Sequence, residues 1–223
     1  MFLQHIEQAF GTAGDERILT FLREQELADC TGDTARWASL FAKNDAWRRE
    51  YLVWETETSI HGVDGWYLSL SAAQLRLPDD EEADWQTYLY RMTLLLVLSG
   101  MDEAERTALL QKGDRYGNLE VVASDFYTSG GCVSITMQEC LDKLYALRQA
   151  SWQRYQRSEG HTPDYAREMA KNYRQFDEAL AYLSRQPQIS EVVRLNDFGG
   201  DDSVWYFAFA PSYLYLLCLS DAL

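Results

Sequence analysis

The sequence predicts a mainly α-helical protein, a single-domain multi-helix bundle, on three observations. Apolar residues recur at steps of three and four along much of the chain, the spacing of one helix face. Proline and glycine are sparse, 4 and 13 of 223 residues, which argues against a turn-rich all-β fold. No repeat or clear linker interrupts the pattern. We therefore expect one domain over 1–223, with a subdivision near 60–80 left open.

The first third of the chain is expected to hold three helices, over 2–10, 15–22 and 33–58. The third carries an aromatic stripe at helical spacing, which we interpret as core rather than as a cofactor site. The stripe comprises Trp37, Phe41, Trp47, Tyr51 and Trp54. Glycines at 62 and 65 then break the pattern. The segment 66–77 alternates like a strand at its start, but its alanines and glutamine favour a helix, which we expect.

Further helices are expected over 85–98, 101–112 and 134–157. The 85–98 segment is apolar on nearly every side, which is typical of a central buried helix. Thr162 followed by Pro163 is a helix start signal, a hydroxyl cap before proline at the first helical position. The tail 204–219 fits either a strand or a buried helix, so short strands near 66–72 and 204–210 stay open.

The chain is strongly acidic, with 35 Asp and Glu against 20 Lys and Arg and a net charge of −15. Such a charge repels phosphate backbones and anionic lipid and steers basic partners toward the surface. We therefore expect no nucleic-acid and no membrane partner. The apolar tail contains Pro211 and falls short of the roughly 20 residues that a membrane span needs.

Two acidic clusters are the candidate partner-binding residues. The run 79–84 holds five carboxylates in six residues, more than the start of the following helix needs for its dipole. A second pair follows a double glycine. Helix stabilisation and partner docking are compatible roles for the run. The candidates are Asp79, Asp80, Glu81, Glu82, Asp84, Asp201 and Asp202.

No catalytic, cofactor or metal motif is apparent, so we assign no catalytic, cofactor-binding or metal-ligating residue. The three histidines are far apart in sequence, and the four cysteines form no paired ligand spacing. We interpret the cysteines as reduced thiols of a cytoplasmic protein, because residues 1–10 lack the basic start of a secretion signal.

Two stretches resemble one protein family. Residues 85–100, running on to Asp114, resemble the Y-x-x-x-L-x-x-L-L-x-x-D helical core of bacterial immunity proteins that accompany PoNe-type DNase toxins. Residues 201–208, continuing through 214–217 to Asp221, are similar to that family's C-terminal D-x-x-Y-W-x-x-E-A-A pattern. The resemblance covers about half of the chain. It implies a mostly helical protein that binds and blocks a cognate secreted toxin.

The chain departs from the family pattern in places. Phe209 stands near the expected glutamate, and Pro211 interrupts the last helix. The function we expect is a cytoplasmic immunity or inhibitor protein that neutralises a toxin with a basic surface, encoded beside it in a bacterial secretion-system cluster. The alternatives are a small hydrolase, with His61, His161, Cys132 and carboxylates converging, or an adaptor outside the immunity class. The sequence leaves the oligomeric state open.

Overall fold

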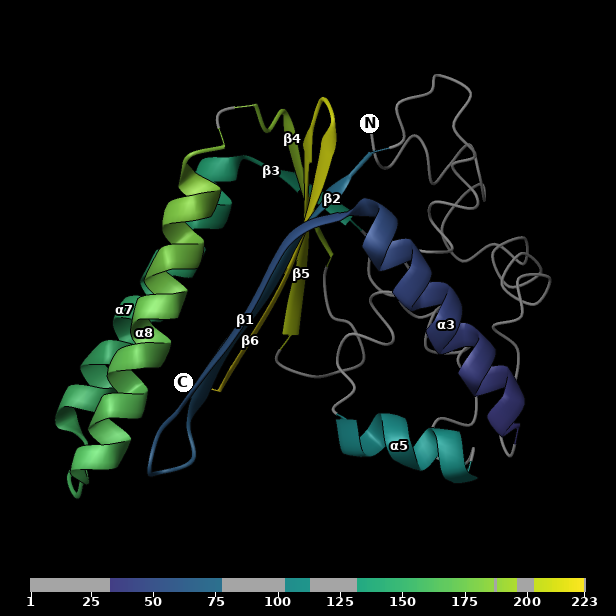
Figure 1. Cartoon of the computed structure of the whole chain (residues 1–223). Coiled ribbons are helices and arrows are strands. Elements are labelled where there is room, and N and C mark those ends of the chain that lie inside the picture. The colour runs from purple at the N-terminus through teal and green to yellow at the C-terminus, as the bar shows by residue number, and fades with distance from the viewer. Residues whose placement is uncertain (1–32, 78–102, 113–131, 187, 196–202, 223) are drawn as a thin grey trace. The chain divides into compact units, whose positions relative to one another are not determined.

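The structure is a computed structural model that describes residues 33–77, 103–112, 132–186, 188–195 and 203–222 (Figure 1). The chain divides into two compact units, one within 1–52 and 78–131 and the other within 53–77 and 132–223. The expectation of a single domain over 1–223 stays a prediction. The expected helices at 2–10, 15–22 and 85–98 lie outside the described residues.

The expectation of a mainly α-helical bundle is wrong, because the second unit is built on a six-stranded antiparallel sheet. The strand order is β1-β2-β6-β5-β4-β3. The strands are β1 (Leu52–His61), β2 (Tyr67–Arg76), β3 (Cys132–Ile135), β4 (Glu191–Leu195), β5 (Ser203–Ala210) and β6 (Tyr213–Ala222). The expected helix at 66–77 is thus a strand, and the expected helix ending near 58 gives way to β1 after Tyr51.

In strand β2, pairing with a distant strand outweighs the local helix propensity of the sequence. Its residues alternate in burial, and Ala72 and Ala73 pair with Leu217 and Leu216 of β6. That ladder satisfies the main chain and buries alternate side chains, which outweighs alanine's advantage in a helix of less than about 1 kcal/mol per residue. Strands β5 and β6 read as nearly continuous apolar runs, because both of their faces are buried: Tyr206 and Phe207 are 2% and 0% exposed.

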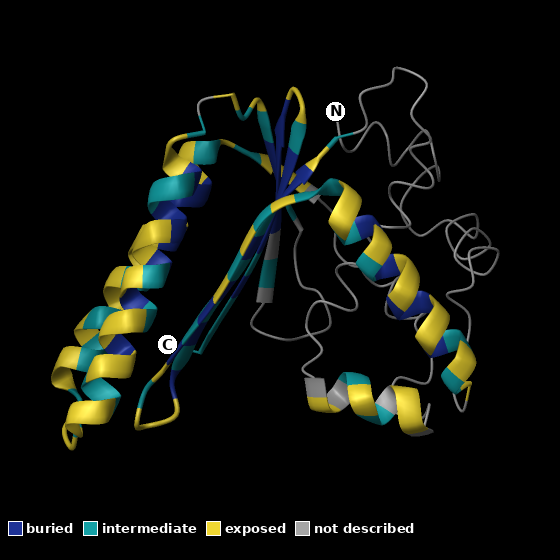
Figure 2. Cartoon of the chain, in the orientation of Figure 1, coloured by how far each residue is buried: buried dark blue, intermediate teal, exposed yellow. Residues whose placement is uncertain are grey.

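Helices α7 (Met137–Arg157) and α8 (Pro163–Ser184) lie side by side along one face of the sheet (Figure 1). The expected start of α8 is confirmed, since Thr162 caps it and Pro163 is its first residue. The apolar face of α8 is buried: Phe176 and Leu180 are 0% and 1% exposed. Figure 2 shows this inner side of the two helices as buried and the outer side as exposed. Each such side chain contributes about 1.5–3 kcal/mol.

The first unit contains α3 (Thr34–Tyr51) and α5 (Glu103–Lys112) among its described residues. The first three rings of the expected aromatic stripe, Trp37, Phe41 and Trp47, are buried in α3, whereas Tyr51 is half-buried and Trp54 lies in β1. Arg106 of α5 bonds Asp45 at 2.8 Å and lies over the Phe41 ring, 4.6 Å from its centroid. These contacts join the two helices through one guanidinium group.

The turn between β1 and β2 depends on a close approach at Gly62. Its N–H donates to the Trp66 carbonyl at 2.7 Å, and Gly65 takes the left-handed conformation with φ 87°. The Trp66 indole is 2% exposed and lies directly against Gly62. A Cβ atom on residue 62 would lie 2.0 Å from Trp66 Nε1, far inside the contact distance of two non-bonded heavy atoms, so the indole would have to move.

We predict that Gly62→Ala destabilises the protein by about 1–3 kcal/mol, the usual cost of an overpacked site. The added methyl must displace the buried Trp66 ring, so the indole N–H signal of Trp66 should shift in NMR spectra. Stability is measured by urea denaturation.

Gly160→Ala is the control for this prediction. Gly160 has φ 83°, but a Cβ there would meet nothing within 4 Å. The control should lose stability through backbone strain alone and leave the Trp66 indole signal in place. An unmoved Trp66 signal in Gly62→Ala would contradict the packing described here.

Candidate functional site

The seven carboxylates proposed from the sequence as partner-binding residues all lie outside the described residues. They are Asp79, Asp80, Glu81, Glu82, Asp84, Asp201 and Asp202. The structure therefore neither brings them together nor separates them, and their role stays a prediction. The described residues offer three other features to consider: a pocket, an aromatic cluster and the outer edge of β1.

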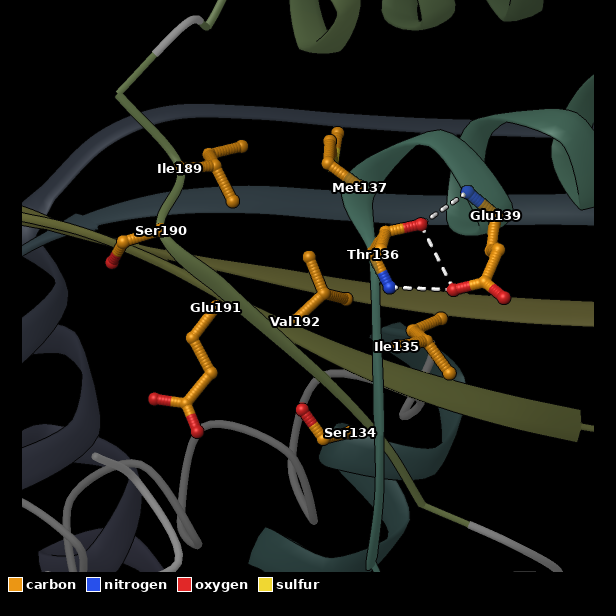
Figure 3. A pocket seen from close by; sticks show the side chains of 9 residues that line it. All are labelled: Ser134, Ile135, Thr136, Met137, Glu139, Ile189, Ser190, Glu191 and Val192. Carbon is orange, nitrogen blue, oxygen red and sulfur yellow. Dashed lines mark hydrogen bonds between the residues drawn. The ribbon is translucent and has the colours of Figure 1, made fainter.

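The pocket opens where β3 turns into α7, beside the chain that enters β4 (Figure 3). Its volume is about 440 Å³. Five polar residues and four apolar ones line it: Ser134, Thr136, Glu139, Ser190 and Glu191 with Ile135, Met137, Ile189 and Val192. The antiparallel pairing of β3 with β4 sets the position of these residues, because Ile135 lies opposite Val192.

Glu139 is held at the first turn of α7 by a capping box. Its carboxylate accepts hydrogen bonds from the Thr136 N–H at 2.7 Å and the Thr136 hydroxyl at 2.8 Å. In return, the Glu139 N–H donates to Thr136 Oγ1 at 3.1 Å. The bond from the Thr136 main chain, and then that from its hydroxyl, lowers the pKa of Glu139 below its ordinary value of 4.5.

The pocket has no reactive centre of its own. It contains neither histidine nor cysteine, and Glu139 already closes the helix start where an anion would otherwise bind. Within the described ranges no group of three or more His, Cys, Asp and Glu could hold a metal ion. Its hydroxyls and carboxylates suit hydrogen bonding to a partner's polar or cationic side chain.

Two residues of the hydrolase alternative, His61 and His161, have described side chains, and both contact Tyr165. His61 ends β1, is exposed, and its Nε2 lies 2.7 Å from Ser59 Oγ. The His161 ring stacks on Tyr155 at 4.3 Å and 4°. Cys132 begins β3, but its side chain is outside the described part.

Of the described thiols, Cys140 is buried and Cys218 is half-buried. Burial raises the pKa of Cys140 to about 12 and that of Cys218 to about 11. Burial, reinforced by the nearby Cys140 and Asp221, also raises the pKa of Tyr206 to about 12. None of these three groups supplies a nucleophile near neutral pH, because the reactive form of a thiol is the thiolate.

Helices α7 and α8 carry a cluster of aromatic residues that pack against one another. Trp152 meets Tyr173 edge to face at 4.9 Å and stacks on Tyr155 at 5.3 Å. Arg148 covers the cluster, with its guanidinium carbon 4.8 Å from the centroid of the Tyr173 ring. Arg148 also forms a bidentate pair with Asp177, two bonds of 2.7 Å each. The rings serve packing between the helices.

The outer edge of β1 is closed over part of its length by α8. Asn172 donates from Nδ2 to the Ser59 carbonyl at 2.8 Å, and the Tyr165 hydroxyl donates to the His61 carbonyl at 2.8 Å. Thr58 completes the junction by donating to the Asn172 carbonyl at 3.1 Å. This strand edge was not predicted, although polar and larger apolar or β-branched residues alternate over 54–61, a pattern typical of a strand.

No protein-family model, curated protein or solved structure matches the chain. Among the helices of the described ranges, none is both long and apolar enough to cross a membrane.

We predict that Arg148→Lys costs about 1 kcal/mol of stability. Lysine cannot form the bidentate pair and stacks less well on aromatic rings. The Arg148 side chain is 22% exposed, so solvent screens the pair only in part. Urea denaturation measures the change.

Arg167→Lys is the matched control for this prediction. Arg167 also pairs with an aspartate, Asp164, but the two side chains are 79% and 86% exposed. This variant should change stability by less than about 0.5 kcal/mol. Equal losses of stability in the two variants would show that the aromatic contacts of Arg148 do not contribute to the stability of the fold.

We predict that Glu139 adds acid sensitivity to folding. Its folded pKa lies below the unfolded value, so its stabilising contribution is present above about pH 4.5 and is lost as the pH falls through the folded pKa. Glu139→Gln keeps an acceptor without the charge. The stability difference between wild type and this variant should therefore shrink from pH 6 to pH 3.

Thermal unfolding across that pH range measures this difference. Glu178→Gln, which alters an exposed carboxylate of α8, is the control and should follow the wild-type profile. A wild-type advantage over Glu139→Gln that stayed constant down to pH 3 would contradict the assignment.

Proposed function

We propose that this chain is an immunity protein that binds and neutralises a cognate secreted bacterial toxin in the cytoplasm, without catalysis of its own. The observation that carries the proposal is the net charge of −15 on 223 residues. A surface of this sign attracts a partner with a cationic cleft and raises the association rate at low ionic strength. A toxin that attacks nucleic acid needs such a cleft to hold phosphates.

The chemistry of the described residues supports binding over catalysis. Cys140, Cys218 and Tyr206 carry raised pKa values, and in the pocket beside α7 the Thr136 hydroxyl that bonds the Glu139 carboxylate belongs to the capping box that starts the helix. The two described histidines belong to different local environments, one exposed and one stacked on tyrosine. Among the described residues no contact favours the hydrolase alternative, and none distinguishes the adaptor alternative.

The choice of a toxin as partner comes from the resemblance to the immunity proteins of PoNe-type DNases. That resemblance rests on residues 85–114 and on the region from 201 to 221. We propose that the carboxylates of Asp79–Asp84, together with Asp201 and Asp202, contact the toxin. The run of five carboxylates in six residues is the densest charge in the chain.

Co-expression tests the function directly. The gene adjacent to this chain's gene is expressed in a bacterial host with and without the chain, and growth is followed. Cells that carry both should survive, and the two proteins should co-purify. Equal killing with and without the chain would refute the immunity function.

We predict that reversing Asp79, Asp80, Glu81 and Glu82 to lysine slows association with the toxin several-fold at about 20 mM salt. Near 1 M salt, where the Debye length is about 3 Å, the change should be within twofold, because screening removes long-range steering. Surface plasmon resonance at both salt concentrations gives the rates.

Reversing four exposed carboxylates to lysine makes the charge-matched control: Asp142 of α7, Glu168 and Glu178 of α8, and Glu159 of the loop between these helices. If the control slows association as much as the test variant, overall charge rather than the acidic run directs binding. If the test variant associates at the wild-type rate in low salt, the proposed contact is refuted.

A further inference from the structure

The ladder between β2 and β6 joins two hairpins, β1–β2 and β5–β6. The turn over 62–65 and the turn over 211–212 each set the pairing within their own hairpin. Gln74 and Tyr215 lie directly opposite each other in the ladder between the hairpins, although 141 residues separate them in the chain. A tight turn cannot set the register over such a distance. Another feature therefore has to select which residues of β2 and β6 face each other.

Burial alone does not exclude a second register for this ladder. A slip by two residues keeps every side chain on its own face of the sheet, because side chains alternate with a period of two. The slip that brings Ala72 opposite Tyr215 would also place Leu68 opposite Leu219, whereas Leu68 now lies opposite Asp221. Half of the β2 side chains between Leu68 and Arg76 are too small to resist the shift: Ser69, Ser71, Ala72 and Ala73. Apolar contacts therefore do not reject this slip.

A closed circuit of four hydrogen bonds distinguishes the two registers. The Tyr182 hydroxyl of α8 donates to Gln74 Oε1, and Gln74 Nε2 donates to the Tyr215 hydroxyl at 3.1 Å. The Tyr215 hydroxyl donates to Gln186 Oε1 at 3.1 Å, and Gln186 Nε2 donates to the Tyr182 carbonyl at 3.2 Å. Burial, with Tyr182 and Tyr213 nearby, raises the pKa of Tyr215 to about 12, so its hydroxyl keeps the proton that it donates. Gln74 and Tyr215 are 5% and 2% exposed, so the circuit supplies the partners that water cannot.

The circuit can close only when Gln74 lies opposite Tyr215. Trp54 of β1 stacks on Tyr182 with 4.2 Å between the ring centroids, which limits the movement of that ring. In the slipped register Ala72 would lie opposite Tyr215 and would offer no amide to either tyrosine. Gln74 would meanwhile move about 7 Å along the strand, out of hydrogen-bond reach of Tyr215. Buried hydroxyl and amide groups left without partners make the slipped register unfavourable.

We infer that the circuit of Gln74, Tyr182, Gln186 and Tyr215 is a register lock, a conformational device that admits only the native pairing of β2 with β6. Buried polar side chains have this role in coiled coils, where one polar residue fixes the register at a cost in stability. The lock acts when the two hairpins join, because the β2–β6 ladder is their connection. Its removal changes which residues face each other and leaves the chain able to fold.

The thiol of Cys218 can report the register. Cys218 lies opposite Ser71 in the native ladder and would lie opposite Ser69 after the slip. Directly opposite residues have Cα atoms about 4.5–5.5 Å apart, which suits a disulfide, whereas diagonal neighbours at about 7–8 Å are too distant. Ser71→Cys therefore reports native pairing, and Ser69→Cys reports slipped pairing. Each full-length variant is equilibrated in a glutathione redox buffer, and its disulfide to Cys218 is quantified by peptide mass spectrometry.

Moving the glutamine by two residues tests the lock at constant composition. The double substitution Ala72→Gln with Gln74→Ala places the amide opposite Tyr215 only after the slip. The yield of the Ser69→Cys disulfide relative to that of Ser71→Cys should rise about tenfold or more, because two buried hydrogen bonds then form only in the slipped register. Gln74→Met removes the amide at similar volume. It should raise the same ratio less, since neither register then gains the bonds.

Thr58→Val is the matched control, because it removes another buried hydrogen bond of the sheet, to the Asn172 carbonyl, and leaves the circuit intact. It should leave the disulfide ratio within about twofold, as expected of an independent site. The inference is overturned if the double substitution leaves the ratio unchanged, if Thr58→Val raises it equally, or if both disulfides form equally well with the circuit intact. Loss of the folded circular dichroism spectrum in every circuit variant also overturns it, because a register lock predicts chains that still fold.

Discussion

The packing of α8 against the sheet is the constraint on which the second unit depends. Phe176 and Leu180 are sealed between the helix and the strands, so α8 can neither slide nor rotate without opening the core. Because the helix is fixed there, its polar residues are fixed too. Asn172 and Tyr165 therefore meet the edge of β1 at defined carbonyls, and Arg148 of α7 meets Asp177. Core packing thus positions the polar contacts at the surface.

The two halves of the β1 edge carry different groups. Toward the hairpin, α8 supplies donors that occupy the outward carbonyls, and toward α3 the strand carries carboxylates instead. Natural sheets protect edges with charge or with covering groups, and β1 uses one device in each half. Covering excludes every strand, whereas charge excludes only strands of the same sign.

Sequence reasoning succeeded where the signal is local and failed where it is not. The start of α8 was predictable because Thr162 and Pro163 encode it within two residues. Strand β2 was not, because Ala72 is held by Leu217, far along the chain. The aromatic stripe of α3 ran on to Trp54 in phase and hid the boundary at Leu52. At the β1 edge, no local sequence pattern predicts the contacts from Asn172 and Tyr165. The acidic run 79–84 was predictable from local charge density, but its role in binding stays a prediction.

The central place of β6 has a consequence for how the chain is made. This strand lies between β2 and β5, yet it is translated after every other strand of the sheet. Until it docks, β2 and β5 both present unpaired edges rich in apolar residues, which are the surfaces that promote aggregation. Its ladder with β2 also closes a long loop, a slow step in folding. A newly synthesised chain is therefore most prone to aggregation before β6 is inserted, while the central strand position of its sheet is still empty.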